Sequence, residues 1–386
     1  MDKTYRMCVR CVMDTTDPDI TFDEHGNCHH CSNALDRLKY RPTPEQGQVY
    51  LNRLVSKIKA EGRGKEYDCV MGLSGGCDST YLAFKVVELG LRPLTLHFDS
   101  GWNSELSVQN IEKTIKHLNL DLFTIVCDWE EMRDLQRSFF RSSLVNCDIP
   151  QDHSFIAALN QLAVQQGVRY WISGHDYWGS ECIMAHAWRG YDASDWFHIR
   201  NVHRLMGGKK LEKYPHNNFF EMFFYYPLIK RIKKVCLFDY LPYKKFEAKE
   251  FLKKEIQWKD YTGKHNESVF TRFFQGYYLP KKFGYDKRKA HLSSLIVSGQ
   301  ITREDALREL AQDFYAPEQL QEDLDFILKK VSLTVEEWDS IMRAPAKFYK
   351  DYPSNGWIFE SLRPCLKLGG QVKRSLLKTR RRYLKY

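Results

Sequence analysis

Residues 70–80, VMGLSGGCDST, decide the fold. They join a short apolar strand predicted over Tyr67–Leu73 to a helix predicted over Ser79–Leu89. Two adjacent glycines, Gly75 and Gly76, let the backbone turn sharply between these elements, so that several N–H groups converge where the helix begins. Such a turn is an anion site suited to phosphate.

Three side chains add chemistry to this turn. The hydroxyls of Ser74 and Ser79 can donate hydrogen bonds, and Asp78 can hold a Mg2+ that bridges phosphates. The pattern G-x-x-x-x-G-K-[ST] is absent from the turn, so no lysine of the loop is aimed at a γ-phosphate. This argues against an ordinary kinase or P-loop NTPase. The alternative interpretation is a glycine-rich turn with an N-capping serine.

Strands and helices alternate beyond this turn. Further strands are predicted over 93–98, 122–126 and 168–173. Helices are predicted over 103–118, 129–140 and 154–167, the last with Ser154 as its N-cap. This alternation predicts an α/β fold with a doubly wound parallel sheet. The rhythm fades after about residue 200, where the chain is first aromatic and basic and then, from Asp286, clearly helical.

Four cysteines near the N-terminus have the spacing of a metal site. Cys8 and Cys11 form one Cys-x2-Cys pair, and Cys28 and Cys31 form another after sixteen intervening residues. A short strand and turn between the pairs complete the pattern of a zinc ribbon, in which four thiolates bind one Zn2+ tetrahedrally. An iron–sulfur cluster is the alternative. Four thiolates leave no open coordination position, so we expect a structural role for the metal.

Five segments are predicted along the chain. They are a zinc-ribbon module (1–40), a helical linker (41–66), a nucleotide-binding α/β domain (67–200), a largely helical substrate- or partner-binding region (201–370) and a basic tail (371–386).

Composition narrows the class of protein. The 386 residues include 43% hydrophobic and 28% charged residues, as in an ordinary globular protein. The net charge of +9 lies mainly in the tail, which has seven basic residues and no acidic one. This distribution disfavours nucleic acid as a partner, because a nucleic-acid binder carries its charge on the folded surface. We find neither an apolar run long enough to span a membrane nor a signal peptide, and therefore expect a cytoplasmic protein.

The glycine-rich turn resembles the PP-loop, S-G-G-x-D-S, of the N-type ATP pyrophosphatases, whose fold is of the adenine nucleotide alpha hydrolase-like type. Members of this superfamily split ATP into pyrophosphate and a substrate adenylate. The resemblance implies an ATP site built from Leu73, Ser74, Gly75, Gly76, Asp78, Ser79, Phe98, Asp99 and Gly174.

A second acidic residue commonly completes the metal site in this superfamily. Residues 172–181, ISGHDYWGSE, resemble the strand-end loop of NAD synthetases, which implies that Glu181 is a second Mg2+ ligand beside Asp78. The alternative is that Glu181 caps the following helix. Asp99 follows another strand at the same carboxyl edge, where doubly wound sheets bind ligands, although a turn aspartate is an equal alternative there.

The chain as a whole resembles the N-acetyl sugar amidotransferases of bacterial surface-polysaccharide and O-antigen biosynthesis. The motifs that carry this resemblance lie at 8–20, 74–79, 98–104, 148–153, 264–268 and 282–303. The family is implied to convert the acetamido group of a nucleotide-activated (UDP-linked) sugar into an acetamidino group. AMP transferred to the amide oxygen makes a leaving group, and ammonia then displaces it.

Basic residues in the matching segments are candidates for the reaction. Lys264 and Arg272 are expected to contact pyrophosphate as catalytic residues. Arg288 and His291 are expected to bind the sugar substrate. The alternative for each basic residue is a solvated surface charge, and for His291 a hydrogen-bonded core histidine.

Ammonia must reach the adenylate in unprotonated form. We find no glutaminase module and no nucleophile-elbow cysteine in this sequence. The resemblance implies partner subunits like the glutaminase and cyclase-type subunits of imidazole-glycerol-phosphate synthase. The region beyond residue 200 and the tail are candidate docking surfaces for them, and the tail is alternatively a contact for anionic membrane lipid.

Two alternatives stay open. A PP-loop tRNA-modifying enzyme of the thiolase type also combines a zinc module with S-G-G-x-D-S, and it would use a single thiol such as Cys147 or Cys182. A nucleophilic role for Cys77, the variable position of the loop, is disfavoured. A zinc-ribbon adaptor without activity is disfavoured because the loop's serines and aspartate are intact.

Overall fold

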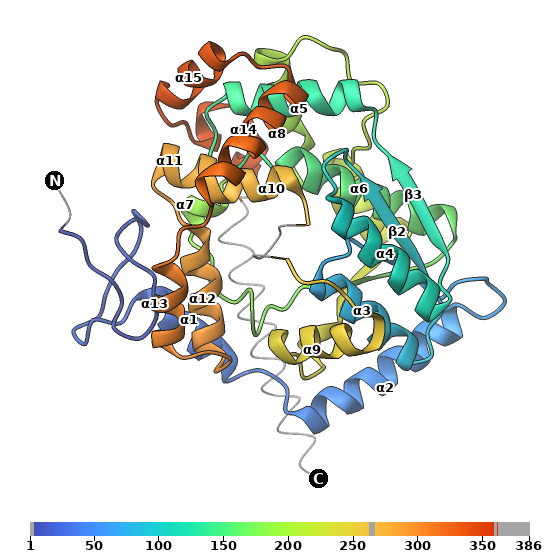
Figure 1. Ribbon diagram of the computed structural model, residues 1–386. Coiled ribbons are helices and arrows are strands. Elements are labelled where there is room, and N and C mark those ends of the chain that lie inside the picture. The colour runs from blue at the N-terminus through green and yellow to red at the C-terminus, as the bar shows by residue number, and fades with distance from the viewer. Residues whose placement is uncertain (1–3, 262–266, 359–360, 362–386) are drawn as a thin grey trace.

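A five-stranded parallel sheet organises the first two thirds of the chain (Figure 1). The computed structural model describes residues 4–261, 267–358 and 361. The strands are ordered β3-β2-β1-β4-β5. Their bounds are Cys69–Gly72 (β1), Pro93–Asp99 (β2), Leu122–Val126 (β3), Tyr170–Ser173 (β4) and Lys233–Cys236 (β5). The predicted α/β class with a parallel sheet is therefore confirmed.

One strand was not predicted. β5 pairs in parallel with β4 at the edge of the sheet. Lys233 and Lys234 are exposed, and only Val235 is fully buried. An edge strand that buries one residue has no apolar run and no clear alternation, so sequence periodicity cannot reveal it.

Helices cover both faces of the sheet, as a doubly wound fold requires. On one face, α2, α3, α4 and α9 pack around a core that includes Leu51, Met71 and Leu252. On the other face, α6 and the π-helix η1 pack on β1 and β2. The bounds in this half are α2 (Pro44–Glu61), α3 (Cys77–Glu88), α4 (Glu105–Leu118), α5 (Trp129–Arg141), α6 (Ile149–Gln165), α7 (His186–Arg189), α8 (Trp196–Met206), η1 (Glu221–Ile229), η2 (Leu237–Asp239) and α9 (Lys245–Ile256).

Helix α6 begins five residues earlier than the sequence indicates. The chain becomes helical at Ile149, with Pro150 in the first turn, where a missing N–H costs nothing. Ser154 is therefore not the N-cap; its hydroxyl donates to the carbonyl of Pro150 within the helix. Because α6 leads into β4, its N-terminus lies at the carboxyl edge of the sheet, and the first turn carries Asp152 there.

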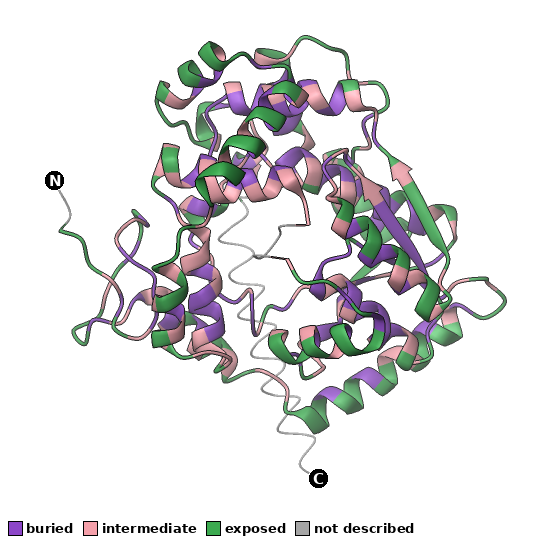
Figure 2. Ribbon diagram, viewed as in Figure 1, coloured by how far each residue is buried: buried purple, intermediate pink, exposed green. Residues whose placement is uncertain are grey.

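The C-terminal region is helical, as predicted. Its elements are α10 (Val269–Phe273), η3 (Phe274–Tyr278), α11 (Leu279–Phe283), α12 (Lys287–Val297), α13 (Arg303–Leu310), α14 (Pro317–Val331), α15 (Val335–Arg343) and η4 (Tyr349–Asp351). α10, α14 and α15 pack against α5 in an aromatic core that includes Phe140, Phe270 and Trp338. Figure 2 shows this buried interior and the exposed outer strand β3.

The N-terminal module packs on the C-terminal helices. Val12 shares a core with Leu292 of α12 and Ala306 of α13, and α1 (His29–Leu38) lies against α12. Arg303 donates hydrogen bonds to the carbonyls of Cys8 and Cys11 at 3.1 and 3.2 Å. The cysteine module is thus held against α12 and α13.

Segments from both sides of residue 200 build the sheet layer. β5 and α9 belong to the sheet and its helical cover, although the predicted nucleotide domain ends at residue 200. The predicted linker forms α2, whose Leu51 and Ile58 are buried against the same core. Among the described residues, no helix is both long and apolar enough to cross a bilayer.

Candidate active site

A cavity of about 540 Å³ lies at the carboxyl edge of the sheet. It opens between β1 and β4, where the strand order reverses and doubly wound sheets form a crevice. Residues of the loops after β1, β2 and β4, the first turns of α6, α9 and the residues that follow it, and the segment from Glu267 to Lys287 line it.

The glycine-rich turn has a defined conformation. Gly75 has φ of +77°, and a Cβ there would lie 2.4 Å from the carbonyl oxygen of Ser107, so only glycine fits. The Gly75 carbonyl accepts hydrogen bonds from Trp258 Nε1 at 2.9 Å and from the Tyr261 hydroxyl at 3.1 Å. Contacts from α4 and from the segment after α9 therefore hold the turn.

The two serines of the turn face each other across it. Ser74 Oγ lies 3.1 Å from Ser79 Oγ, and the Ser74 N–H donates to Ser79 Oγ at 3.2 Å. The N-cap of α3, Gly76, has no side chain to bond the first-turn N–H groups of that helix. These N–H groups and both hydroxyls can bind an anion at the positive end of the helix.

Asp78 is held by two residues that sequence reasoning missed. The Tyr243 hydroxyl donates to one carboxylate oxygen, and Lys245 Nζ lies 3.5 Å from the other. Burial lowers the pKa of Lys245, but Asp78 and further acidic neighbours outweigh burial and raise it. Lys245 is therefore an ammonium group beside the turn. The cation that the loop motif lacks is supplied by a residue distant in sequence.

Two more carboxylates face this ammonium group. Glu181 lines the cavity and forms an ion pair with His175. Glu267 lies against the turn, with Oε1 3.0 Å from where a Cβ on Gly76 would lie. Both carboxylates contribute to the raised pKa of Lys245. Oxygen ligands of this kind suit Mg2+, which usually takes one or two carboxylates together with phosphate oxygens.

The far side of the cavity carries a second acidic pair. Asp148 accepts hydrogen bonds from Thr271 Oγ1 at 2.8 Å and from the Gln151 amide. The Asp152 side chain opens into the cavity, and no described residue donates a hydrogen bond to it. Burial by the surrounding protein, followed by the charge of Asp148, raises the pKa of Asp152 to about 7, while Lys287 acts in the opposite direction.

Most predicted nucleotide-site residues line this cavity. They are Leu73, Ser74, Gly76, Asp78, Ser79, Phe98, Gly174 and Glu181. Gly75 lies beneath the turn and shapes it. Asp99 is a turn aspartate, because its carboxylate accepts from the Gly101 N–H at 2.8 Å and from Asn103 at 3.0 Å.

The two predicted arginines, Arg272 and Arg288, do not line the cavity. Arg272 is paired with Asp323 through two hydrogen bonds of 2.7 and 2.8 Å. Arg288 pairs with Asp286, and neither Arg288 nor His291 lines the cavity, whereas Lys287 does. Lys264 lies outside the described residues.

The thiols suggested for sulfur chemistry are buried in this structure. Burial raises the pKa of Cys147 and of Cys182, and neither lines the cavity. Cys77 does line it, but burial and then the charge of Asp78 raise its pKa to about 12. A protonated thiol is a poor nucleophile, so the structure favours neither a sulfur-transfer role nor catalysis by Cys77.

The four N-terminal cysteines converge on one point. Their sulfur atoms all lie within 4.8 Å of one another, and all four residues are buried. The Cys8–Cys31 and Cys11–Cys28 sulfurs are 3.7 and 3.6 Å apart. A tetrahedron of Zn–S bonds of about 2.3 Å has edges of about 3.8 Å, so the cluster fits one zinc ion. A cluster of several irons would hold the sulfurs further apart.

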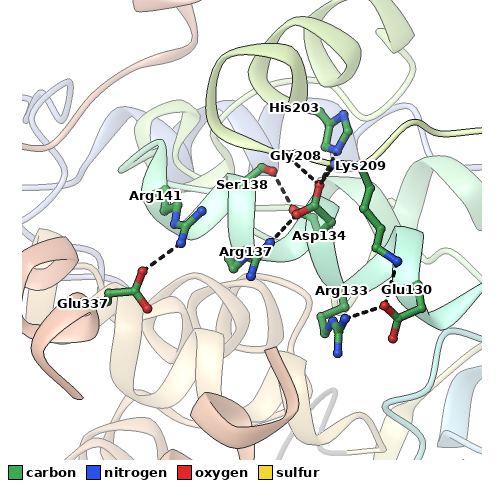
Figure 3. A network of polar contacts seen from close by, with 10 residues as sticks. All are labelled: Glu130, Arg133, Asp134, Arg137, Ser138, Arg141, His203, Gly208, Lys209 and Glu337. Carbon is green, nitrogen blue, oxygen red and sulfur yellow. Dashed lines mark hydrogen bonds and ion pairs between the residues drawn. The ribbon is translucent and has the colours of Figure 1, made fainter. Parts of the chain in front are cut away.

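A second network of ionised residues lies away from the cavity (Figure 3). Asp134 of α5 accepts hydrogen bonds from the N–H groups of Gly208 and Lys209, both at 2.8 Å, and from Arg137 at 2.6 Å. His203 Nε2 lies 2.9 Å from it. Burial alone would raise the pKa of Asp134, but these hydrogen bonds lower it. The network fixes α8 and the loop after it to α5.

Comparison with protein families gives one match, to the C-terminal part of the chain. Residues 267–363 match the family described as "LPS biosynthesis protein WbpG-like, C-terminal domain". No curated protein matches the chain.

Solved structures with some similarity to the chain include two synthetases and a tRNA thiolase. NMN synthetase from Francisella tularensis has 17% identity over 57% of this chain and 98% of its own, with a TM-score of 0.27. NH3-dependent NAD synthetase from Campylobacter jejuni has 14% identity over 74% and 94%, with a TM-score of 0.31. The U34-tRNA thiolase NcsA from Methanococcus maripaludis has 13% identity over 79% and 88%, with a TM-score of 0.31.

These scores are too low to carry an argument, so the fold rests on the strand order given above. The family match covers the segment that carries Thr271 and Lys287 into the cavity and that binds the cysteine module through α12 and α13. The C-terminal part of this chain is thus similar to the C-terminal domain of WbpG-like proteins of lipopolysaccharide biosynthesis.

Proposed function

We propose that this chain is an ATP-dependent amidotransferase that converts the acetamido group of a UDP-linked N-acetyl sugar into an acetamidino group. One observation carries the proposal. A single cavity joins an anion-binding turn with Asp78 and Lys245 on one side to residues of a WbpG-like domain on the other. ATP and a sugar substrate would meet there.

The first step is activation of the amide oxygen. This oxygen attacks the α-phosphorus of ATP, an O–P bond forms, and pyrophosphate leaves with the electron pair of the broken bond. The N–H groups of α3, Ser74 and Lys245 are placed to bind the phosphates and to neutralise the charge of the departing pyrophosphate. Asp78 and Glu181 are the residues that would hold Mg2+, which neutralises further phosphate charge.

The second step replaces AMP with ammonia. A C–N bond forms to the imidate carbon, the C–O bond breaks, and AMP leaves with that electron pair. The attacking nitrogen must lose a proton, and Asp152 is the cavity group suited to accept it, because its carboxyl has a pKa near neutrality and receives no hydrogen bond from the described part of the chain. Lys287 can bind the diphosphate of the sugar nucleotide from the same side.

Zinc has a structural role in this proposal. The cysteine module supports α12, the helix that begins with Lys287, through Val12 and through the bond from the Val12 N–H to Ser293 Oγ at 3.2 Å. We expect one zinc per chain by metal analysis, and we expect Cys28→Ser to lose the metal and to lower stability before it alters the chemistry. An iron-containing, coloured preparation would contradict the assignment.

Ammonia is supplied by a separate glutaminase, with a cyclase-type subunit, in a complex like imidazole-glycerol-phosphate synthase. The physical reason is that ammonium has no lone pair, whereas a shielded path delivers unprotonated ammonia. Equal use of glutamine by the isolated chain and by the assembled complex would contradict this division of labour. We place the reaction in the cytoplasm, where ATP and UDP-sugars are available.

The decisive experiment is direct. The protein is incubated with ATP, Mg2+, ammonium and a panel of UDP-N-acetyl sugars, and both pyrophosphate and the sugar product are measured. We expect pyrophosphate release and, by mass spectrometry, replacement of one oxygen atom by an NH group on one sugar. Release of ADP and orthophosphate, or transfer of sulfur to RNA, would refute the proposal.

A further inference from the structure

The π-helix η1 presents an unusually apolar outer surface. Phe220, Phe224, Leu228 and Ile229 each expose between 44% and 64% of their surface. Phe220 and Phe224 stack with ring centroids 5.8 Å apart. Residues four or five apart share a side of a π-helix, so these four side chains lie together. An exposed apolar cluster of this kind marks a contact surface.

The inner side of η1 is anchored, so the outer surface has a fixed orientation. Tyr226 is buried in the core between the sheet and α6, and its hydroxyl donates to Asn217 at 3.0 Å. Met222 Sδ accepts weak hydrogen bonds from Asn160 and Asn217 at 3.9 and 4.0 Å. The exposed side chains therefore do not belong to a frayed segment. They are held outward by an element packed on the fold.

Basic residues border the apolar cluster. Lys230 and Arg231 follow η1 directly, and Lys233 and Lys234 lie on the edge strand β5; all four are exposed. Glu221 is the only acidic residue between positions 218 and 238. We call these eight residues the 220–234 patch: Phe220, Phe224, Leu228, Ile229, Lys230, Arg231, Lys233 and Lys234.

The positive charge of the 220–234 patch and its position outside the cavity exclude several kinds of binding partner. A twofold contact with a second copy would place basic residues against basic residues, and the tail 371–386, with seven basic residues and no acidic one, would be repelled in the same way. The patch contributes no residue to the cavity lining among the described residues. An ammonia-delivering subunit docked there would have no direct opening into the site.

We propose that the 220–234 patch is a docking surface for an anionic lipid bilayer. A bilayer offers an apolar interior beneath a negative surface, and this matches both parts of the patch at once. Phenylalanine, leucine and isoleucine enter the acyl region, while lysine and arginine stay at the headgroups. This inference does not depend on the chemistry of the active site.

The test is co-sedimentation of the full-length protein with vesicles. One set is phosphatidylcholine alone, and the other contains equal parts phosphatidylcholine and phosphatidylglycerol. We expect binding to the anionic vesicles only. The variant F220S/F224S/L228S should bind at least about tenfold more weakly, because three apolar side chains no longer enter the bilayer. Replacing the four basic residues with glutamine should weaken binding by up to about fivefold per charge.

Two controls separate the patch from other contributions. V108S/V335S alters valines of similar exposure on α4 and α15 and should bind like wild type. R380Q/R381Q/R382Q removes charge from the tail, and this variant should still bind anionic vesicles at high salt, because the apolar side chains of the patch remain. Wild-type binding by F220S/F224S/L228S would overturn the proposal. So would a wild-type protein that ignores vesicles and forms a larger species which this serine variant converts to monomer, because that result identifies a protein interface.

Discussion

Asp134 and Asp152 are two aspartates held in opposite electrostatic states: Asp134 is buried, whereas Asp152 is exposed at the cavity. Asp134 receives hydrogen bonds from two backbone N–H groups and from Arg137, and it pairs with His203, so its pKa is lowered (Figure 3). Asp152 receives no hydrogen bond from a described residue, and its pKa is raised to about 7. The hydrogen bonds of the Asp134 carboxylate are supplied by the protein, whereas the Asp152 carboxyl faces the cavity.

The difference between the two aspartates distinguishes a carboxylate that stabilises the fold from one that is available for chemistry. A fully bonded carboxylate such as Asp134 has no capacity left for a substrate, and its loss leaves other buried groups unpaired. A carboxyl such as Asp152 costs the fold stability when it ionises, and it remains available for proton transfer. A perturbed pKa alone therefore does not mark an active site. Whether such a residue belongs to an active site depends on how many hydrogen-bond partners the protein gives it and on whether it opens to the cavity.

The largest expected effect comes from a third carboxylate, Asp78. D78A should lower pyrophosphate release by about 10³-fold or more, because it removes a proposed metal ligand and the partner of Lys245. Zinc content should stay as in wild type. Pyrophosphate release is measured with each UDP-sugar that supports it. Activity within a fewfold of wild type would remove Asp78 from the proposed mechanism.

The next prediction concerns Asp134. D134A should lower the free energy of unfolding by about 3–5 kcal/mol, because it leaves His203 and two backbone N–H groups without their partner. Urea unfolding measures the loss. The rate per folded molecule should remain close to wild type. A stable D134A protein with impaired chemistry would break the distinction between the two aspartates.

Much of the fold could be predicted from the sequence. Four of the five strands, the glycine-rich turn and the cysteine cluster follow from local patterns: apolar runs, adjacent glycines and Cys-x2-Cys spacing. β5 could not be predicted because it buries too few side chains to leave a pattern. The start of α6 was misplaced because Pro150 suggests an end to regular structure, whereas in a first turn it favours a helix.

The site was harder to predict than the fold. Residues next to the turn in sequence could be placed, but Tyr243 and Lys245 reach Asp78 only through tertiary packing of the segment before α9. The only signal in the sequence was a modest excess of basic residues between 230 and 264. Arg272 was expected to contact pyrophosphate, yet its guanidinium pairs with Asp323, because the local sequence does not reveal a partner's position.

A smaller effect is expected for Asp152 itself. D152N should slow amidine formation by about 10²-fold through loss of the proton acceptor, while adenylation, measured by pyrophosphate–ATP exchange, should persist. In wild type the rate of the ammonia step, divided by the concentration of unprotonated ammonia, should rise with pH through an apparent pKa near 7, as the carboxyl ionises. This limb should be absent from D152N. Equal loss of both half-reactions would indicate a binding role instead.

The smallest effect is the dependence of stability on pH, and its sign differs between the two aspartates. The pKa of Asp134 is lower in the folded state, so its stabilisation is present above the ordinary aspartate value of about 4 and is lost as the pH falls below it. The pKa of Asp152 is raised to about 7, so the folded state binds the extra proton, and stability declines as the pH rises from about 4 to 7. Water in the cavity screens Asp152, which keeps its contribution small. Urea unfolding of D134N and D152N across this range measures both slopes. In the plot of unfolding free energy against pH, D134N should flatten the slope on the acid side, and D152N should flatten the slope between about pH 4 and 7. The same change in both variants would show that the two carboxyl groups do not differ in the way their surroundings indicate.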